Sequence, residues 1–259
     1  MSGFLFHDIM FGPVRSRRLG LSLGINLLPI HSKYCSFNCI YCECGWTPEN
    51  MNIIPDLPSR ELVSEYLEYR LKELVEENHI PDVLTYAGNG EPTMHPEFAG
   101  IVDDTLALRD KYMPGIKVTV LSNGSMVHDP SVFKALLKLD NNIQKLDAGF
   151  DKTFRLINNP VLPIKFNDLV GDLKKFNGQV IIQSMFLRGS FKGETIDNTT
   201  GPEVDLWLQQ LDIIRPSLVM LYPISRATPV HNLEKIGIFE LEKIAERVRK
   251  LGIEAAVYT

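Results

Sequence analysis

The sequence predicts an α/β protein built on a parallel sheet. Three observations support this fold class. Short apolar segments typical of buried strands alternate with longer segments that have apolar residues at helical spacing. About seven such strands can be counted along the 259 residues. Glycines and polar side chains gather just after the strands. Strands that alternate with helices favour parallel pairing with right-handed crossovers. We therefore expect a partial TIM-like barrel of about six or seven βα units.

The first elements surround a cysteine-rich segment. A lead-in rich in Gly, Pro and Arg begins at residue 11 and runs into an apolar strand over residues 23–28. Helical periodicity predicts a helix over residues 59–77, with Ser59 as its N-cap. A short strand over residues 82–87 comes next, followed by Gly88-Asn89-Gly90-Glu91-Pro92-Thr93. Two glycines there allow a sharp turn or a close approach to a ligand.

The same alternation continues to the end of the chain. A helix is expected from Phe98, and Asp129-Pro130 suits the start of another. Later helices are expected over residues 166–176, from about residue 202, and over residues 241–251. The remaining strands are expected at 116–121, 143–146, 180–186, 218–222 and 253–257. The polar segment 188–200 is predicted to be a mobile loop.

All four cysteines of the chain lie between residues 35 and 44. Cys35, Cys39 and Cys42 follow a Cys-x3-Cys-x2-Cys pattern, and Cys44 follows closely. Thiolates bind soft metals and iron–sulfur clusters. Three thiolates on a four-iron cluster would leave one iron free to bind a reacting molecule, as the open position of a catalytic zinc site does. Two other readings remain open: a structural zinc knot of all four cysteines, and disulfides.

Composition narrows the class of protein. The chain is 44% hydrophobic and 23% charged, which is ordinary for a globular protein. No apolar run approaches the length of a membrane span, and residues 1–8 lack the pattern of a signal peptide, so we expect a cytoplasmic protein. The net charge of −5 does not favour a nucleic-acid partner. Arg15, Arg17 and Arg18 form the one visible basic group, and their role is open.

The unusual residues follow successive strands. The cysteine segment, Gly88-Asn89-Gly90-Glu91, Ser122-Asn123-Gly124 and Asp147 each lie just past a predicted strand. The carboxyl ends of parallel strands form one face, where α/β barrels bind and react their substrates. We expect these residues to converge there, which a zinc knot with a purely structural role would not require.

Together these residues resemble the radical S-adenosylmethionine (SAM) enzymes. Cys35-x3-Cys39-Ile40-Tyr41-Cys42 is similar to the cluster motif of the family, and Gly88-Asn89-Gly90-Glu91-Pro92 to its Gly-Gly-Glu element, with Asn89 in place of a glycine. The pattern is most similar to the Fe–S oxidoreductases related to the wyosine-forming tRNA enzymes. That subgroup is suggested by the segments 12–20, 41–45, 90–93 and 146–149. The resemblance implies one radical SAM domain over residues 1–259, with a cluster loop at 31–46 and a barrel over about 23–258.

The resemblance also implies cofactors and chemistry. Cys35, Cys39 and Cys42 would hold a [4Fe–4S] cluster, whose fourth iron would bind the amino and carboxylate groups of SAM. An electron from the reduced cluster, supplied by a donor such as flavodoxin or ferredoxin, would cleave SAM to a 5′-deoxyadenosyl radical. That radical would abstract hydrogen from a substrate. The hard chemistry belongs to the cofactor, and the protein orients it.

Eight further residues are predicted to contact SAM. Tyr41 and Tyr222 would lie against the adenine, and Gly90 and Glu91 would meet the methionine amino group. The other contacts are expected from Ser122 and Asn123 to the carboxylate or ribose, and from Asp147 and Gln183 to ribose hydroxyls. Each has a plain structural alternative, such as core packing for the tyrosines and helix capping for Asp147. Cys44 is interpreted as a packed thiol and not a ligand.

The substrate is not encoded in these residues. A small molecule, a peptide or a nucleotide would all be compatible. Wyosine-type modification of tRNA is the obvious extension, but Cys44 alone cannot supply a second cysteine-ligated cluster. Lys145, Arg188 and Arg226 lie near predicted strand ends and could hold a carboxylate or phosphate. Two rival classes remain: a zinc-binding structural or interaction module, and an iron–sulfur electron carrier.

Overall fold

A curved, mostly parallel sheet forms the centre of the molecule. The structure is a computed structural model that describes residues 3–48 and 55–259. Seven strands pair in parallel in the order β2-β3-β4-β5-β6-β8-β10. They are β2 (Gly20–Ile25), β3 (Val83–Tyr86), β4 (Lys117–Ser122), β5 (Asn141–Lys145), β6 (Ile181–Phe191), β8 (Leu218–Pro223) and β10 (Glu254–Val257). The predicted parallel partial barrel, with its seven strands, is confirmed.

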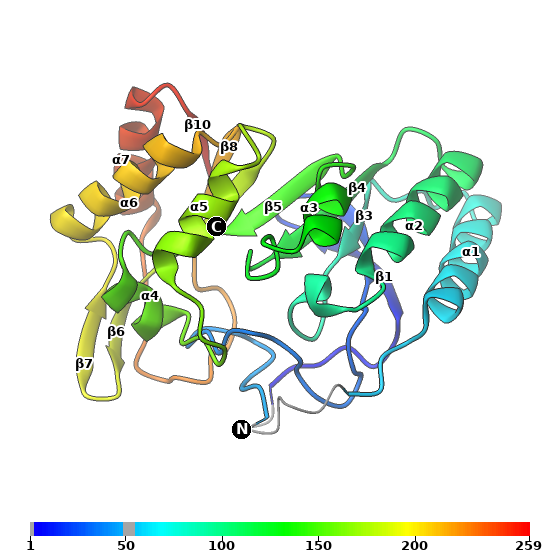
Figure 1. The fold of residues 1–259 in the computed structure, drawn as a ribbon, viewed down its shortest axis with the longest axis horizontal. Coiled ribbons are helices and arrows are strands. Elements are labelled where there is room, and N and C mark those ends of the chain that lie inside the picture. Colours follow the sequence, from blue (N-terminus) through cyan, green and yellow to red (C-terminus); the bar gives the residue numbers. More distant parts are fainter. Residues whose placement is uncertain (1–2, 49–54) are drawn as a thin grey trace.

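Helices connect consecutive parallel strands. They are α1 (Arg60–Glu76), α2 (Phe98–Tyr112), α3 (Pro130–Leu136), α4 (Asp151–Ile157), α5 (Phe166–Lys174), α6 (Gly201–Ile214) and α7 (Ile238–Lys250), with a 3₁₀ turn, η1 (Pro92–Met94). Figure 1 shows most of them along the outer side of the sheet, while the blue segment after β2 crosses below the strands. Side chains of Leu, Val, Ile and Phe between sheet and helices form the main core.

The predicted helix starts are confirmed. The hydroxyl of Ser59 accepts a hydrogen bond from Leu62 N (3.3 Å) at the start of α1. The carboxylate of Asp129 accepts from Ser131 N (2.7 Å) and Val132 N (3.2 Å) at the start of α3. These side chains satisfy backbone N–H groups that have no partner inside the helix.

Two predicted boundaries near the N-terminal edge are wrong. The lead-in is itself a strand, β1 (Met10–Ser16), which pairs antiparallel with β2. The strand predicted over residues 23–28 ends at Ile25, because the side chain of Asn26 bonds to both the N–H and the C=O of Leu28. Such a local side-chain bond turns the backbone out of the ladder.

The predicted mobile loop at 188–200 is also wrong. Strand β6 continues to Phe191 and turns into β7 (Glu194–Asp197), which pairs antiparallel with it. A short strand, β9 (Glu234–Lys235), pairs antiparallel with Leu187 and Arg188 of β6. The polar residues of this segment suit a solvent-facing hairpin. The alternation of apolar strands with helices did not reveal it. Helix α4 was not predicted either, because its seven residues are too short to show a clear period.

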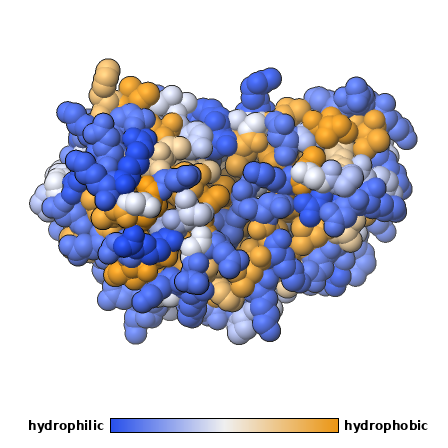
Figure 2. Space-filling view, turned by 90° about the horizontal axis from the view of Figure 1, so that it is seen from above, coloured by the Kyte–Doolittle hydropathy of each residue, from blue (hydrophilic) through white to orange (hydrophobic). Residues whose placement is uncertain are grey.

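Among the described residues, no helix combines the length and the apolar character needed to cross a membrane. Figure 2 shows one face of the molecule, on which hydrophobic residues occur in separate groups between hydrophilic ones. Scattered apolar residues of this kind are normal on globular proteins.

Candidate functional site

The cysteine loop is fastened to two neighbouring parts of the barrel. Tyr34 donates its N–H to Asn89 O (2.9 Å), and its carbonyl accepts from Glu91 N (3.0 Å), so the loop pairs with the chain just after β3. On the other side, Ile40 N donates to Ile157 O (3.0 Å) at the end of α4. The loop therefore spans from one half of the barrel to the other, at the carboxyl side of the strands.

Gly90 allows the closest of these approaches. Its φ is +143°, and a Cβ built on it would lie 1.9 Å from Tyr34 O. Any other residue would clash with the backbone of the cysteine loop. The glycine predicted from the motif thus has a local role that needs no ligand.

Asn89 has a defined role of its own where a glycine was expected. Its Nδ2 donates to Phe6 O and Pro29 O, both at 2.8 Å, and its Oδ1 accepts from Phe6 N at 2.8 Å. The side chain is fully buried. It ties the N-terminal segment and the start of the cysteine loop to the end of β3.

Glu91, Ser122 and Asn123 form one buried network beside Cys35. The carboxylate of Glu91 accepts from the N–H (3.0 Å) and hydroxyl (2.5 Å) of Thr93 and from Asn123 N (2.5 Å). Burial raises the pKa of Glu91, and these hydrogen bonds, including one from Ser122, offset part of the rise. The structure brings these three predicted residues together; their contacts with SAM remain predictions.

Tyr41 and Asp147 are joined directly. The hydroxyl of Tyr41 donates to Asp147 Oδ2 and accepts from Lys145 Nζ (2.6 Å). Asp147 Oδ1 accepts from Met185 N (2.8 Å), and Lys145 Nζ lies 3.7 Å from Asp147 Oδ2. Burial, and next the neighbouring Asp147 carboxylate, hold the pKa of Tyr41 well above its usual value, so the phenol stays protonated. Lys145, singled out as a possible anion-binding residue, is thus paired within the site.

Gln183 and Tyr222 meet at an arginine. Arg18 donates to Gln183 Oε1 (2.6 Å), and its guanidinium carbon lies 4.8 Å from the centre of the Tyr222 ring. Gln183 is paired in register with Lys145 and with Met220, so it lies between β5 and β8. Arg18 had no assigned role in the sequence. The structure places it against two of the residues predicted to contact SAM.

A buried lysine ammonium is bonded within the cysteine loop. The side chain of Lys33 is 3% exposed, and its Nζ donates to Gly45 O (3.0 Å). Burial lowers the pKa of Lys33, but negative charge on Cys42 and on the other three cysteines outweighs that effect and raises it. Within residues 3–48 and 55–259, Lys33 forms no ion pair with a carboxylate.

The thiols themselves lie in different environments. Burial raises the pKa of Cys35 to about 12 and also raises that of Cys39. A hydrogen bond with Cys44 lowers the pKa of Cys42 to about 5, and the same contact raises the pKa of Cys44. Cys44 Sγ also donates to Gly88 O (3.5 Å), in agreement with a packed thiol.

The thiols of this loop are the ligand type that iron–sulfur clusters use. No group of three or more His, Cys, Asp or Glu side chains in the described parts of the chain is arranged to hold one metal ion. A buried ammonium is stabilised by nearby negative charge, which thiolates of this loop supply, because an isolated buried charge is costly. The site provides the soft thiolate ligands that a cluster needs, and a cluster bound by three thiolates carries negative charge.

Besides Arg18, sequence reasoning missed two residues of the site, Lys33 and Asn158. Lys33 lies two residues before the first cysteine, a position that could have been noticed from its charge. Asn158 follows α4 and donates its Nδ2 to Asp147 Oδ2 (2.7 Å) and Cys39 Sγ (3.5 Å). Nothing in the sequence indicates this contact, because it depends on how α4 packs against the loop.

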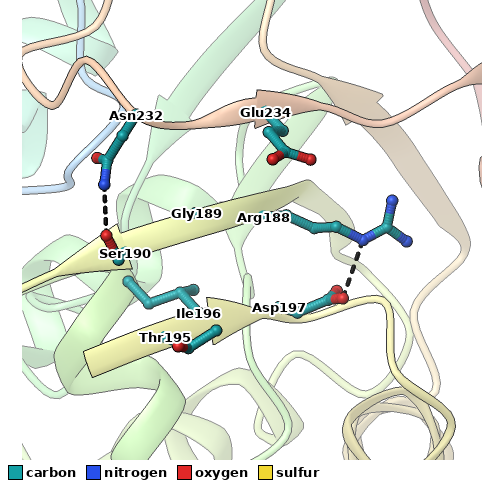
Figure 3. Close-up of a pocket in the computed structure, with 8 residues that line it drawn as sticks. All are labelled: Arg188, Gly189, Ser190, Thr195, Ile196, Asp197, Asn232 and Glu234. Atoms are coloured by element: carbon teal, nitrogen blue, oxygen red, sulfur yellow. Dashed lines mark hydrogen bonds and ion pairs between the residues drawn. The ribbon is translucent and has the colours of Figure 1, made fainter. Parts of the chain in front are cut away.

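Arg188 and Arg226, which could have held a substrate anion, are both engaged in ion pairs. Arg226 pairs with Glu43 on the cysteine loop. Arg188 binds Asp197 (2.9 Å), Thr199 (2.6 Å) and Glu240. Both Arg188 and Asp197 line an open hollow of about 390 Å³ between the β6–β7 hairpin and residues 232–234. Figure 3 shows these two side chains joined by their interaction. Neither a cysteine nor a residue predicted to contact SAM lines this hollow, so it is separate from the site.

The structure is a parallel α/β partial barrel with a cysteine-rich loop at the carboxyl side of its strands, and comparison with known proteins identifies its family. The model of the radical SAM superfamily matches residues 29–161. The chain belongs to the radical SAM superfamily. Members of this superfamily are enzymes that use a [4Fe–4S] cluster and SAM.

Curated relatives resemble most of this chain. A protein named GTPase Obg from Brachyspira hyodysenteriae is 32% identical over 90% of this chain and 32% of its own length. A UPF0026 protein from Helicobacter pylori is 32% identical over 70% of this chain and 57% of its own. A UPF0026 protein from Methanocaldococcus jannaschii is 34% identical, over 71% and 55%. The chain thus spans between about a third and somewhat over half of these relatives.

Solved structures share the fold at low identity. A radical SAM methyltransferase from Sphaerobacter thermophilus aligns with a TM-score of 0.63 and 13% identity, over 91% of this chain and 65% of that one. TYW1 with a lysine-pyruvate adduct aligns with a TM-score of 0.63 and 15% identity, over 88% and 73%. At such identities the likeness establishes the partial barrel and not a reaction.

Proposed function

We propose that residues 1–259 form one radical SAM domain in which Cys35, Cys39 and Cys42 hold a [4Fe–4S] cluster that cleaves SAM. Residues 1–2 and 49–54 of this domain lie outside the described structure. The observation that carries the proposal is the Cys-x3-Cys-x2-Cys segment, held by backbone bonds between the end of β3 and the end of α4, with the buried Lys33 bonded to Gly45 O in the same loop. A buried positive charge without a carboxylate partner in the described chain suits an anionic cluster in this loop.

When bound, the cluster would supply the electron that converts SAM to a 5′-deoxyadenosyl radical, which takes a hydrogen from the substrate. The residues of the chain bind and orient. Tyr41 would present its ring to the adenine, because Asp147 and Lys145 fix its hydroxyl. Gly90 and Glu91 would face the methionine amino group, for which a carboxylate is a natural partner.

The other contacts are proposed from residues in the same region. Ser122 and Asn123 would meet the carboxylate or the ribose, Asp147 and Gln183 the ribose hydroxyls, and Tyr222 the adenine. Support comes from their mutual contacts: Asn123 N binds Glu91, and Asp147 binds Tyr41. The carboxylates of Glu91 and Asp147 also hold these neighbours in place, so either residue has a positioning role besides any contact with SAM.

Cysteine substitutions test the ligand assignment. Cys35→Ala, Cys39→Ala and Cys42→Ala should each lose most of the iron and sulfide found in the wild type after anaerobic reconstitution. Cys44→Ala is the matched control, because Cys44 lies in the same loop but is bonded to Gly88 O, and it should retain both. Equal loss in all four variants, with zinc bound in place of iron, would instead support a four-cysteine zinc knot.

Glu91→Gln separates a SAM enzyme from an electron carrier. In a radical SAM enzyme, the variant should load iron but form much less 5′-deoxyadenosine from SAM. An electron carrier would be reduced and reoxidised at the wild-type rate, whether or not Glu91 is changed. Unchanged 5′-deoxyadenosine formation would remove Glu91 from the proposed SAM site.

For the substrate, we propose membership of the subgroup related to the wyosine-forming enzymes, with an electron donor such as flavodoxin or ferredoxin. The supporting residues are the motifs at 12–20, 41–45, 90–93 and 146–149. A tRNA base is one substrate class within that proposal, although the net charge of −5 does not favour it. Incubating the reconstituted enzyme and SAM with tRNA would test it, with modified nucleoside as the readout.

A further inference from the structure

Two buried amide side chains point a donor at cysteine sulfurs. Asn158, after α4, places its Nδ2 3.5 Å from Cys39 Sγ. Asn123, after β4, places its Nδ2 3.5 Å from Cys35 Sγ. These residues come from opposite sides of the cysteine loop and are 1% and 4% exposed. The backbone N–H of Phe37 also donates to Cys35 Sγ, at 3.4 Å.

The hydrogen-bond network fixes which end of each amide faces the sulfur. The Oδ1 of Asn123 accepts from Ser125 N (2.9 Å), so its NH₂ group must face Cys35 and Ser36 Oγ (2.9 Å). Asn158 binds the carboxylate of Asp147 at 2.7 Å, and of the two ends of its amide only the NH₂ group can donate to a carboxylate. The second proton of that NH₂ group is then available to Cys39.

Asp147 fixes the position of the Asn158 amide that contacts Cys39. Its carboxylate has three donors, from Tyr41, Met185 and Asn158, and is held between β5 and β6. Because the carboxylate is fixed, the amide that it binds is fixed as well. The donor to Cys39 is therefore built into the fold and does not depend on a mobile side chain.

Lys33 adds a full positive charge to these two dipoles. Its ammonium lies inside the loop that carries the four cysteines and bonds to Gly45 O. Hydrogen bonds to the sulfurs and positive charge near a cluster both stabilise its reduced form, which carries one more negative charge. Asn123, Asn158 and Lys33 would therefore all raise the reduction potential of the cluster.

We propose that Asn123, Asn158 and Lys33 set the reduction potential of the cluster, raising it so that a cellular one-electron donor can reduce it. The proposal rests on the proposed function, since it requires the cluster on Cys35, Cys39 and Cys42. One electron passes from the external donor to the cluster, and no bond of the protein forms or breaks. These three are positioning residues that act on the cluster through its ligands.

A potentiometric titration followed by electron paramagnetic resonance tests this proposal on the reconstituted protein. Asn158→Leu removes the donor at similar volume, and Lys33→Met removes the charge at similar length. In each variant, the reduced-to-oxidised ratio of the cluster at a fixed potential should fall about tenfold, which for a one-electron couple corresponds to a midpoint about 59 mV lower. Lys33→Arg should restore most of the shift caused by Lys33→Met.

Asn142→Leu is the matched control. Asn142 is also a buried amide, although it lies in strand β5, and it is bonded to Gln144 and Gln179 O and not to a cysteine. Its midpoint should equal that of the wild type. Midpoints of Asn158→Leu and Lys33→Met that match Asn142→Leu would overturn the proposal. Failure of the wild type itself to assemble a four-iron cluster would instead contradict the proposed function.

A measurement on the wild-type protein tests the same hydrogen bonds even if the variants do not load the cluster. Resonance Raman spectra in H₂O and D₂O report hydrogen bonds to the cysteine sulfurs, because exchange of an N–H···S proton shifts the iron–sulfur stretching bands. We expect such a shift in the wild type. Spectra that are identical in the two solvents would overturn the proposed donors.

Discussion

The contact between Gly90 and Tyr34 gives a sharp test of how the barrel holds the cysteine loop. In Gly90→Ala, the new methyl group would lie 1.9 Å from Tyr34 O and 2.5 Å from Tyr34 C, with φ at +143°. The unfavourable backbone conformation costs about 1–3 kcal/mol. Forcing the loop away by overpacking costs about 1–3 kcal/mol more. The expected loss of unfolding free energy is therefore about 2–6 kcal/mol, against a typical total of about 5–15 kcal/mol.

Gly115→Ala is the matched control for this experiment. Gly115 also has a positive φ, +93°, but nothing lies within 4 Å of its added Cβ. It should show the backbone cost alone, about 1–3 kcal/mol. Urea unfolding gives both free energies, and iron per chain after reconstitution reports on the loop. If Gly90→Ala is as stable as Gly115→Ala and loads iron like the wild type, the close approach does not position the cysteines.

Three further predictions concern the surroundings of the site. Asp147→Asn should cost about 3–5 kcal/mol in urea unfolding, because it removes the fully buried partner of the Lys145 ammonium, whose side chain is itself only 15% exposed. Asp103→Asn, in an exposed pair with Lys138, should cost about 0–1 kcal/mol, and equal losses would contradict the role of burial. Arg18→Ala should lower the free energy of unfolding by about 1–3 kcal/mol, since Gln183 Oε1 loses its donor. A smaller loss in urea unfolding would show that water replaces the guanidinium as the donor. Burial lowers the pKa of His95, whose Nδ1 accepts from Glu97 N (3.1 Å) while Nε2 lies 2.9 Å from Pro58 O. The unfolded chain, with a pKa near 6.5, then binds a proton that the folded chain does not, so stability should fall as pH drops below about 6.5. The slope should be smaller in His95→Gln, and an unchanged slope would assign the effect to other groups.

The fold was predictable where local signals are strong and repeated. The strand and helix periods, together with caps such as Ser59 and Asp129, recovered the seven parallel strands and most of the helices. What failed depends on tertiary contacts. Strand β7 is paired only through β6, with Arg188 opposite Asp197, and a polar sequence without long apolar runs does not reveal such a hairpin.

The same division holds for the site. Cys35, Cys39 and Cys42 stand out by their spacing, and Gly90 by its motif, because each pattern is contained within a few residues of the chain; their roles toward a cluster and SAM stay predictions. Asn158 bonds to Cys39 across 119 positions of the chain, and Arg18 bonds to Gln183 across 165. No pattern within a short window can show such pairs. They follow only from the register of the sheet and the packing of α4.

The most direct test of the account is one assay on anaerobically reconstituted protein. Iron and sulfide are quantified, the protein is reduced with dithionite, SAM is added, and 5′-deoxyadenosine is measured. The account predicts one four-iron cluster per chain and 5′-deoxyadenosine that disappears in each of the Cys35→Ala, Cys39→Ala and Cys42→Ala variants but persists in Cys44→Ala. A fully loaded and reduced cluster that neither binds nor cleaves SAM, or a protein that takes up zinc in place of iron, would contradict it.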